Sequence, residues 1–306
     1  MTTHWLVTGA HGLLGREVRA ELAADPGAVV TAPGRDRLDI TDPAAVRAAV
    51  DGHRVVVNCA AWTDVDGAER DEAAATAVNG TGVRHLARAC ADTGALLLHI
   101  STDYVFPGDA RGPYPEDAPT EPVNAYGRSK QAGERAVAEL LPETGYIVRT
   151  AWLYGEHGRN FVATVLGLAA RRTTLDVVAD QHGQPTWSRA LARHLAALGR
   201  AALAGRAPAG VYHGTAAGQT TWHGLARETF RLGGLDPARV RPVGSDKFPR
   251  PAARPAFGVL GHGNWARAGL APLPRWDDQL TAALATPHFA ALALAARSAV
   301  GGHPPD

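Results

Sequence analysis

Residues 5–15 read Trp5-Leu6-Val7-Thr8-Gly9-Ala10-His11-Gly12-Leu13-Leu14-Gly15, and they predict the architecture more strongly than any other segment. An apolar strand leads into a turn with three glycines, and a helical pattern follows to about residue 24. Glycines in such a turn let the backbone approach a pyrophosphate, which then rests on the first amides of the helix. The spacing is G-x-x-G-x-x-G rather than G-x-G-x-x-G, but its place between the first strand and the first helix predicts a dinucleotide site. The residues that we expect to line this site are Gly9, His11, Gly12, Leu13, Leu14 and Gly15.

Short apolar runs alternate with helical patterns through the first half of the chain. Residues 55–57 are all valine, as expected of a strand that is covered on both faces of a sheet. Thr41 or Asp42 can cap a helix whose first residue is Pro43. Strands that alternate with helices imply right-handed crossovers and a parallel sheet. We therefore predict an α/β protein in which residues 1–150 form a Rossmann-like, doubly wound parallel sheet. The expected elements are strands at 5–8, 29–32, 55–57, 96–101 and 146–150, and helices at 13–24, after 42, at 71–93 and at 124–141.

The sequence changes character after Thr150, where glycine and proline interrupt the pattern more often. We predict that residues 151–306 form mainly a smaller C-terminal substrate-binding lobe, with some segments returning to the sheet. The tail at 301–306 is expected to be disordered. The helices expected in this half lie at 161–171, 188–204 and 221–232.

Composition excludes several classes of function. The net charge is +1, with acids and bases interspersed, so we expect neither nucleic acid nor a membrane as a partner. Cys59 and Cys90 are the only cysteines, too few for a disulfide framework or a zinc site, and we predict no metal. The chain begins with an apolar strand rather than a leader, and no stretch has the length of a membrane span. We therefore expect a cytoplasmic protein.

The cofactor preference should be set at the end of the second strand, where an acid would bind the adenosine ribose and repel a 2′-phosphate. The chain instead has Gly34-Arg35-Asp36-Arg37, whose arginines can bind a phosphate. Asp36 weakens this signal, so we predict NADPH and leave NADH open. Asp39 and Ile40 follow, and they suit the adenine amino group and its apolar flank. An acid in a solvated loop is the alternative interpretation of Asp39.

The candidate reacting groups come from two further segments. The chain has two lysines, and one of them, Lys130, stands four residues after Tyr126. A compact ammonium can bond both hydroxyls of a nicotinamide ribose and lower the pKa of a nearby phenol, whereas a guanidinium is bulkier. Thr102 ends the fourth strand, where open parallel sheets bind their ligands. We expect Thr102 to bind a carbonyl, Tyr126 to act as general acid and Lys130 to hold the ribose. The alternatives are an exposed helix face for the pair and a turn cap for Thr102 and Asp103.

These motifs resemble the dTDP-4-dehydrorhamnose reductase family of extended short-chain dehydrogenases/reductases over about residues 4–285. The segments at 101–106, 180–186 and 251–255 are specific to this family, and the earlier ones mark the superfamily. The full set of matching segments is 8–15, 38–42, 58–66, 78–82, 101–108, 125–130, 149–155, 180–186, 210–213 and 251–255.

The resemblance implies NADPH-dependent reduction of the 4-keto group of a dTDP-bound 6-deoxy sugar. It implies that Thr102 and Tyr126 hold the carbonyl and that Lys130 holds the nicotinamide ribose. Asn79 resembles the helix asparagine of the superfamily's proton path. The further residues that it places at the cofactor are Ala60, Ala61, Trp62 and Thr63. Those that it places near the sugar or the nucleotide are Asp103, Trp152, Asn160, Phe161 and, at the diphosphate, Arg254, for which a loop salt bridge is the alternative.

Some positions depart from the family pattern. Members commonly have Tyr at the position of Trp62 and Ser at that of Gly258, so the pocket can differ. Some members dimerise through a metal held by glutamates, of which only Glu17 matches, so the resemblance predicts no metal and leaves a homodimer open. The segment after about 286 is not covered.

Three other functions remain open at this point. A sugar-nucleotide 4,6-dehydratase would need a glutamate at the position of Tyr104. A dTDP-dihydrostreptose-type synthase would use the same residues on another keto-sugar. A regulatory subunit would keep the fold and bind the nucleotide without turnover, but it would have no need of Thr102, Tyr126 and Lys130 together.

Overall fold

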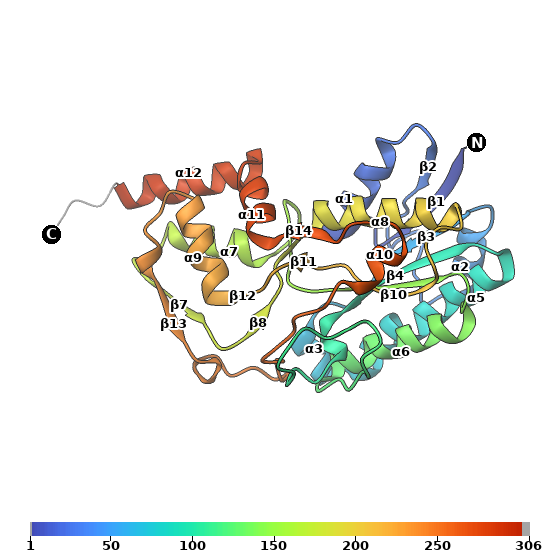
Figure 1. Ribbon diagram of the computed structural model, residues 1–306, viewed down its shortest axis with the longest axis horizontal. Helices are drawn as coiled ribbons and strands as arrows, with labels where there is room; N and C mark the ends of the chain where they lie inside the picture. Colours follow the sequence, from blue (N-terminus) through green and yellow to red (C-terminus); the bar gives the residue numbers. More distant parts are fainter. Residues whose placement is uncertain (1, 302–306) are drawn as a thin grey trace.

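At the centre of the computed structural model, which describes residues 2–301, lies a six-stranded parallel sheet (Figure 1). The prediction of an α/β protein with a parallel sheet is confirmed. From β1 the chain passes outward to β2 and then returns to β3, β4 and β5 on the other side of β1, as in doubly wound sheets. In order across the sheet the strands are β10 (Gly210–His213), β5 (Gly145–Thr150), β4 (Leu96–Thr102), β3 (Val55–Asn58), β1 (Thr3–Thr8) and β2 (Ala28–Thr31).

Helices cover both faces of this sheet (Figure 1). Side chains of β1 alternate between the faces, so Trp5 and Val7 pack in one apolar core and Leu6 packs in the other. The helices α1 (Leu13–Ala23) and α8 (Ser188–Leu203) lie in the first layer, and α2 (Pro43–Val50), α5 (Val83–Thr93) and α6 (Ala125–Leu140) lie in the second. Two elements of the second half of the chain, α8 and β10, therefore belong to the sheet layers.

Local capping signals define the helix starts. Asp42 accepts hydrogen bonds from the amides of Ala44 and Ala45, and Pro43 is the first residue of α2, as the sequence predicts. The prediction of one regular helix over 71–93 is wrong, because α4 (Glu72–Thr76) is followed by a π-helical turn, η1 (Ala77–Gly82), before α5 begins. A further helix, α3 (Val65–Arg70), precedes them.

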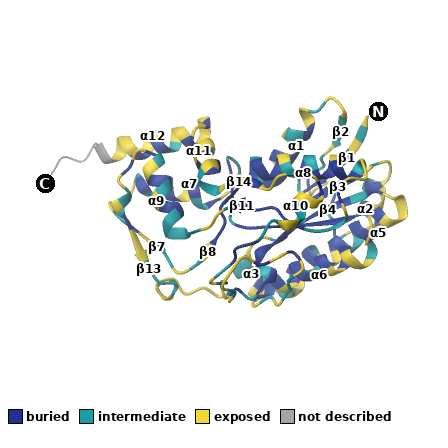
Figure 2. Ribbon diagram, viewed as in Figure 1, coloured by how far each residue is buried: buried dark blue, intermediate teal, exposed yellow. Residues whose placement is uncertain are grey.

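The remaining elements form a smaller lobe at the other end of the molecule, where the helices bury their inner faces against one another (Figure 2). Its helices are α7 (Phe161–Ala169), α9 (Trp222–Leu232), α11 (Trp276–Leu284) and α12 (Pro287–Gly301), with α10 (Gly263–Arg267) nearer the sheet. Its strand pairs are β6 (Leu153–Tyr154) with β9 (Thr186–Trp187), β7 (Leu175–Val178) with β13 (Val240–Val243), β8 (His182–Gly183) with β12 (Thr220–Thr221), and β11 (Ala216–Ala217) with β14 (Leu273–Arg275). Short 3-10 turns complete the set: η2 (Asp103–Val105), η3 (Pro237–Arg239) and η4 (Ser245–Lys247).

The helix α12 gives a role to the segment after 286 that the family resemblance left without one. Its side chains Phe289, Ala293 and Ala296 are buried in the large core, and α12 packs against α7. Residues 302–306 of the tail expected to be disordered lie outside the described part. Within residues 2–301 no single helix is long and apolar enough to cross a membrane, and α11 and α12 meet that test only as a pair bent by 78°.

Candidate active site

Two adjoining cavities share part of their lining, and the first of them lies at the carboxyl ends of the sheet strands. The first measures about 660 Å³ and the second about 720 Å³, and Tyr104 and Trp222 line both of them. The first runs from the glycine turn to Lys130, and the second lies over β7 and α7 of the smaller lobe. Most of the residues predicted at the cofactor line the first cavity: Gly9, His11, Gly12, Leu13, Leu14, Gly15, Arg35, Asp39, Ile40, Ala60, Ala61, Thr63, Tyr126 and Lys130.

The glycine turn has the shape that a pyrophosphate needs. Gly9 has a φ of 61°, and a Cβ there would lie 2.5 Å from the amide nitrogen of Ala60. A Cβ on Gly15 would lie 2.2 Å from the carbonyl oxygen of Gly9. Gly12 caps α1 without a side-chain hydrogen bond, so the first-turn amides beside the cavity have no capping side chain. These features fit a dinucleotide whose phosphates rest on the N-terminus of α1.

The adenosine end of the first cavity contains one of the two predicted arginines. Arg35 lines the cavity, its side chain is 84% exposed, and its Nε lies 3.5 Å from Oδ2 of Asp39. Arg37 is exposed and does not line the cavity. Asp39 is also bound by the amide and hydroxyl of Thr41, and these bonds lower the pKa of its carboxyl. Of the two arginines, Arg35 is therefore the one that lines the cavity.

Two residues predicted at the cofactor do not line either cavity. The side-chain amide of Asn79 accepts from the Trp62 amide at 2.9 Å and donates to Oγ of Ser129 at 2.9 Å. The indole of Trp62 donates to the carbonyl of Asp64 and, like Tyr126, packs against a small cluster of buried alanines. Asn79, which lies in the π-helical turn, therefore holds the backbone of the segment whose neighbours Ala60 and Ala61 line the cavity.

Thr102, Asp103 and Tyr126 line the first cavity beside Tyr104, which also lines the second. Thr102 donates to Oδ1 of Asp103 at 3.0 Å and accepts from the amide of Tyr104 at 3.2 Å. Thr102 thus caps η2, as the alternative interpretation expected, and it also lines the first cavity. The rings of Tyr104 and Tyr126 are in edge contact, with centroids 5.8 Å apart. A ligand oxygen in this corner can reach both a threonine hydroxyl and a phenol.

Burial dominates the electrostatics of this corner. It raises the pKa of Asp103 to about 7, against the opposing effect of the Thr102 hydrogen bond. Burial also raises the pKa of Tyr126, and the charge of Asp103 raises it further. The expectation that Lys130 lowers the pKa of the Tyr126 phenol is wrong for this arrangement, because burial and the charge of Asp103 raise that pKa. The phenol keeps its proton at neutral pH and is therefore a proton donor.

Lys130 is 2% exposed and lies on the inner face of α6. Its Nζ donates to the carbonyl oxygen of Ile100 at 2.6 Å and lies 3.4 Å from Nε2 of His99. Burial lowers the pKa of this ammonium to about 8, and the charges of Glu134 and Cys59 act in the opposite direction. The N-terminus of α6 is fixed by Asn124, whose side chain accepts from the amide of Gly127 at 2.7 Å.

The aromatic residues predicted near the sugar lie together. Trp152 stacks on Trp222, with centroids 3.6 Å apart and an interplanar angle of 9°. Phe161 lines the second cavity and lies against Trp222 at 4.7 Å. Asn160, by contrast, lines neither cavity, because its side chain caps α7 at the amide of Ala163 and donates to Gly155.

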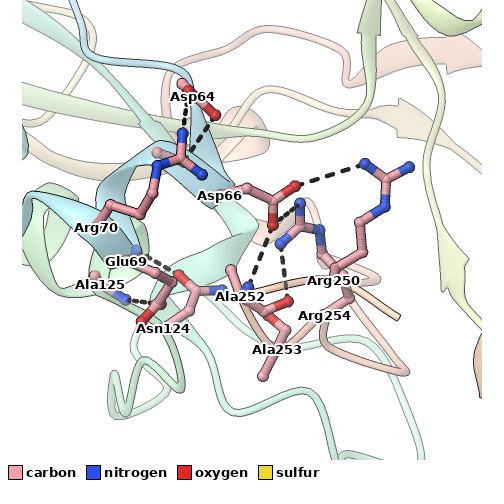
Figure 3. A network of polar contacts seen from close by, with 12 residues as sticks. Asp64, Asp66, Glu69, Arg70, Asn124, Ala125, Arg250, Ala252, Ala253 and Arg254 are labelled. Carbon is pink, nitrogen blue, oxygen red and sulfur yellow. Dashed lines mark hydrogen bonds and ion pairs between the residues drawn. The ribbon is translucent and has the colours of Figure 1, made fainter. Parts of the chain in front are cut away.

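Arg254 has a protein partner as well as a place in the second cavity. Its Nη2 lies 3.0 Å from Oδ1 of Asp66 in α3 (Figure 3). Asp66 also accepts from the amide of Ala252 at 3.2 Å and lies 3.5 Å from Arg250. The loop salt bridge that was the alternative for Arg254 is therefore present, and it ties the 250–254 segment to the larger unit.

Sequence reasoning did not single out several residues that line the cavities. Trp222 directly follows Thr221, which caps α9, and an aromatic residue at that point was the available signal. The arginines of the second cavity had no such signal, because they come from three separate segments. These missed residues are Trp222, Arg172, Arg241, Arg250 and Phe248.

No group of three or more His, Cys, Asp or Glu side chains in the described residues is placed to hold a metal. Glu17, the one residue that matched a metal position, is buried with its Oε2 3.3 Å from Nε of Arg189.

Comparisons with known proteins agree with this geometry. Residues 3–288 match the family model described as RmlD substrate binding domain. A Streptomyces griseus protein named dTDP-4-dehydrorhamnose reductase is 62% identical over 279 residues, which cover 90% of this chain and 91% of the relative. A Streptomyces niveus protein named dTDP-4-keto-6-deoxy-D-glucose reductase is 54% identical over 287 residues, covering 92% and 97%. The solved structure of a Bacillus anthracis dTDP-4-dehydrorhamnose reductase in complex with NADP is similar with a TM-score of 0.87 and 36% identity, over 93% of this chain and 99% of that one.

Proposed function

Because the chain belongs to the RmlD substrate binding domain family, we propose that it is an NADPH-dependent reductase of a dTDP-bound 4-keto-6-deoxy sugar. The observation that carries the proposal is the junction of the two cavities. Thr102 and Tyr126 line the first cavity, which fits a dinucleotide, and Tyr126 contacts Tyr104, which lines both that cavity and the second one in the smaller lobe. A carbonyl held there is within reach of a proton donor and of the cofactor's end of the first cavity.

The residues of the chain divide the work of reduction. The dinucleotide, when bound, supplies the hydride. Thr102 and Tyr126 hold the carbonyl oxygen, and Tyr126 gives its proton to that oxygen as negative charge develops there. The high pKa of the buried phenol keeps it protonated until this step. Lys130 then lies on the cofactor side of the cavity, where a compact donor can hold ribose hydroxyls.

The lining of the second cavity suits the nucleoside diphosphate part of the substrate. Four arginines line it, and guanidinium groups bind phosphate oxygens through paired hydrogen bonds. Phe248, Phe161 and Trp222 add aromatic surface that suits a base and a sugar. The arginines are Arg172, Arg241, Arg250 and Arg254.

We favour the L-configured ketone of the dehydrorhamnose type, because the relative at 62% identity carries that name. The relative at 54% identity is named for a D-glucose-derived ketone, so the names of the two relatives differ in the configuration of the sugar. A dihydrostreptose-type product is the second candidate, since Gly258 leaves room beside Asp103: a Cβ there would lie 2.6 Å from Oδ2 of Asp103. A homodimer and a cytoplasmic location stay predictions.

The test is incubation of the purified protein with NADPH and a dTDP-4-keto-6-deoxy sugar, with and without a 3,5-epimerase, followed by mass spectrometry. We expect NADPH oxidation and a product heavier by two hydrogens, only when a keto-sugar is present. A dependence on the epimerase identifies the L-sugar as the substrate. Formation of a 4-keto-6-deoxy product from dTDP-glucose alone would contradict the proposal, because Tyr104 stands where a dehydratase needs a base.

A further inference from the structure

A chain of buried polar groups runs behind Lys130, away from the cavity. It passes from Lys130 to His99 in β4, and from His99 to Asn58 in the neighbouring strand β3. The sheet register pairs Asn58 directly with His99, so these two side chains meet for a structural reason. His99 and Asn58 are both fully buried. Neither residue has a role in the mechanism described so far.

The orientation of the Asn58 amide follows from a backbone group. Its Oδ1 lies 3.1 Å from the amide nitrogen of Ala60, which can only donate, and 2.6 Å from the hydroxyl of Thr8. Turning the amide over would place its NH2 group against the Ala60 donor. Nδ2 of Asn58 therefore points at Nδ1 of His99, 3.0 Å away, and donates to it.

This donation determines the tautomer of His99. A neutral imidazole carries one proton, so a ring that accepts at Nδ1 is protonated at Nε2. Burial and the charge of Lys130 hold the pKa of His99 well below its usual value, so the ring stays neutral. The Nε2–H group then points at Nζ of Lys130, 3.4 Å away. An ammonium has no lone pair to accept this bond, whereas a neutral amine has one.

We propose that His99 is a positioning residue for Lys130: fixed by Asn58 in its Nε2-protonated form, it donates to the neutral amine of Lys130 and so favours release of the lysine proton. The amine form then satisfies every neighbour, because Nζ donates to Ile100 and accepts from His99. The ammonium form leaves two donors facing each other in a buried place. A buried conflict of this kind is unfavourable, because neither donor has an acceptor.

The other groups that face Lys130 act in the opposite direction. Glu134, one turn further along α6, favours the ammonium through its charge, and Cys59, after β3, does so only when it is a thiolate. Glu134 is already paired with Arg149 at 2.8 Å, and burial raises the pKa of Cys59 to about 12, so that thiol is uncharged at neutral pH. Burial outweighs both and lowers the pKa of Lys130 to about 8.

The consequence for turnover rests on the proposed reductase function. Reduction leaves Tyr126 as a phenolate, which needs one proton before the next cycle. The ammonium of Lys130 can supply that proton and become an amine, and the amine takes a proton back from water. A lysine with an ordinary, high pKa would release its proton far less readily. His99 thus acts through Lys130 and does not itself touch the reacting atoms.

The chain offers an unusually clean measurement, because Lys130 and Lys247 are its only lysines. Protein labelled with 13C at the lysine ε-carbon gives two signals, and Lys247→Arg identifies which of them belongs to Lys130. We expect the Lys130 signal of the wild type to titrate with a midpoint near pH 8. The titration needs neither substrate nor turnover, so its outcome does not depend on the proposed reaction.

Two variants test the tautomer of His99 through the direction in which the Lys130 midpoint moves. His99→Phe keeps the ring volume and removes the donor to the amine, and Asn58→Leu lets His99 turn its proton to Nδ1 and accept from the ammonium. Both should raise the Lys130 midpoint, by roughly one pH unit. His194→Phe, a half-buried ring on α8, is the matched control and should leave it unchanged. A midpoint that falls or stays in His99→Phe overturns the proposal, because an accepting His99 would stabilise the ammonium.

The wild-type protein gives a second readout if a variant fails to fold. Long-range 1H–15N correlations report the protonated ring nitrogen of each histidine, and a His99 ring protonated at Nδ1 overturns the proposal. In the enzyme assay, the apparent pKa that Lys130 contributes to the kcat–pH profile should rise in His99→Phe, together with the lysine midpoint. Absence of any reductase activity in the wild type would contradict the proposed function alone and leave the titration result intact.

Discussion

Trp152 and Trp222 lie face to face, with their ring centroids 3.6 Å apart, although they are 70 positions apart in the chain. Trp152 follows β5 and Trp222 begins α9 of the smaller lobe. Among the described residues Trp152 is the one non-glycine with a positive φ, 47°, a conformation that costs energy. Gly183 leaves room for its indole, since a Cβ there would lie 2.4 Å from Cε2 of Trp152. The stacked pair therefore forms a wall of the first cavity, and Trp222 also lines the second.

Removal of this wall should weaken substrate binding. For Trp222→Ala we expect KM for the nucleotide sugar to rise about two- to tenfold, because an aromatic contact contributes about 0.5–1.5 kcal/mol beyond area burial. KM for NADPH should change less, since the glycine turn is untouched. Trp276→Ala, which changes a tryptophan outside both cavities, is the control. Equal effects of the two substitutions on the sugar KM would contradict a specific role of Trp222.

The cofactor preference should depend on one arginine rather than two. Arg35 lines the first cavity and Arg37 does not, so Arg35→Ala should reduce the NADPH-over-NADH ratio of kcat/KM about ten- to hundredfold. Arg37→Ala should leave this ratio near that of the wild type. Steady-state kinetics with both cofactors decide the matter. An unchanged ratio in Arg35→Ala means that another group recognises the 2′-phosphate.

Lys130→Arg should lose most activity while the fold survives. A guanidinium keeps the positive charge, but it is always protonated and too large for the site between Ile100 and His99. Loss of a well-placed acid–base partner commonly reduces the rate by about 10²–10⁴. The measurement is kcat as a function of pH, with thermal melting as the control. Near wild-type turnover in a stably folded variant would remove the Tyr126–Lys130 pair from the mechanism.

Lys130→Met should be inactive but more stable than the wild type at pH 7. Burial lowers the pKa of Lys130 from its usual 10.5 to about 8, so below pH 8 the folded wild type carries a charge that burial disfavours. Between pH 8 and 10.5 the unfolded chain binds this proton and the folded chain does not, so wild-type stability rises with pH. The excess Tm of the variant, a few degrees at pH 7, should therefore shrink as the pH is raised above 8. A constant difference in Tm across this range would show that the lysine has no depressed pKa.

The local features of the chain could be predicted because they depend on neighbours in sequence. The strands of the first half, the cap at Asp42 and the start of α6 after Asn124 follow from apolar runs and capping chemistry over a few residues. The glycine turn is local in the same sense, so its place at a cavity beside α1 followed from the sequence. The π-helical turn could not be predicted in this way, because its amino acids also suit a regular helix.

The contacts that define the site required the three-dimensional arrangement. The sequence alone contains the order of the elements, the capping residues and the candidate groups Thr102, Tyr126 and Lys130. It does not contain which distant segments meet: that α8 and β10 join the sheet layers, that Trp222 stacks on Trp152, or that Asn58 turns its amide toward His99. The physical reason is that such pairs depend on strand register and on the packing of whole elements, whereas caps and periodic patterns depend on a single turn of backbone.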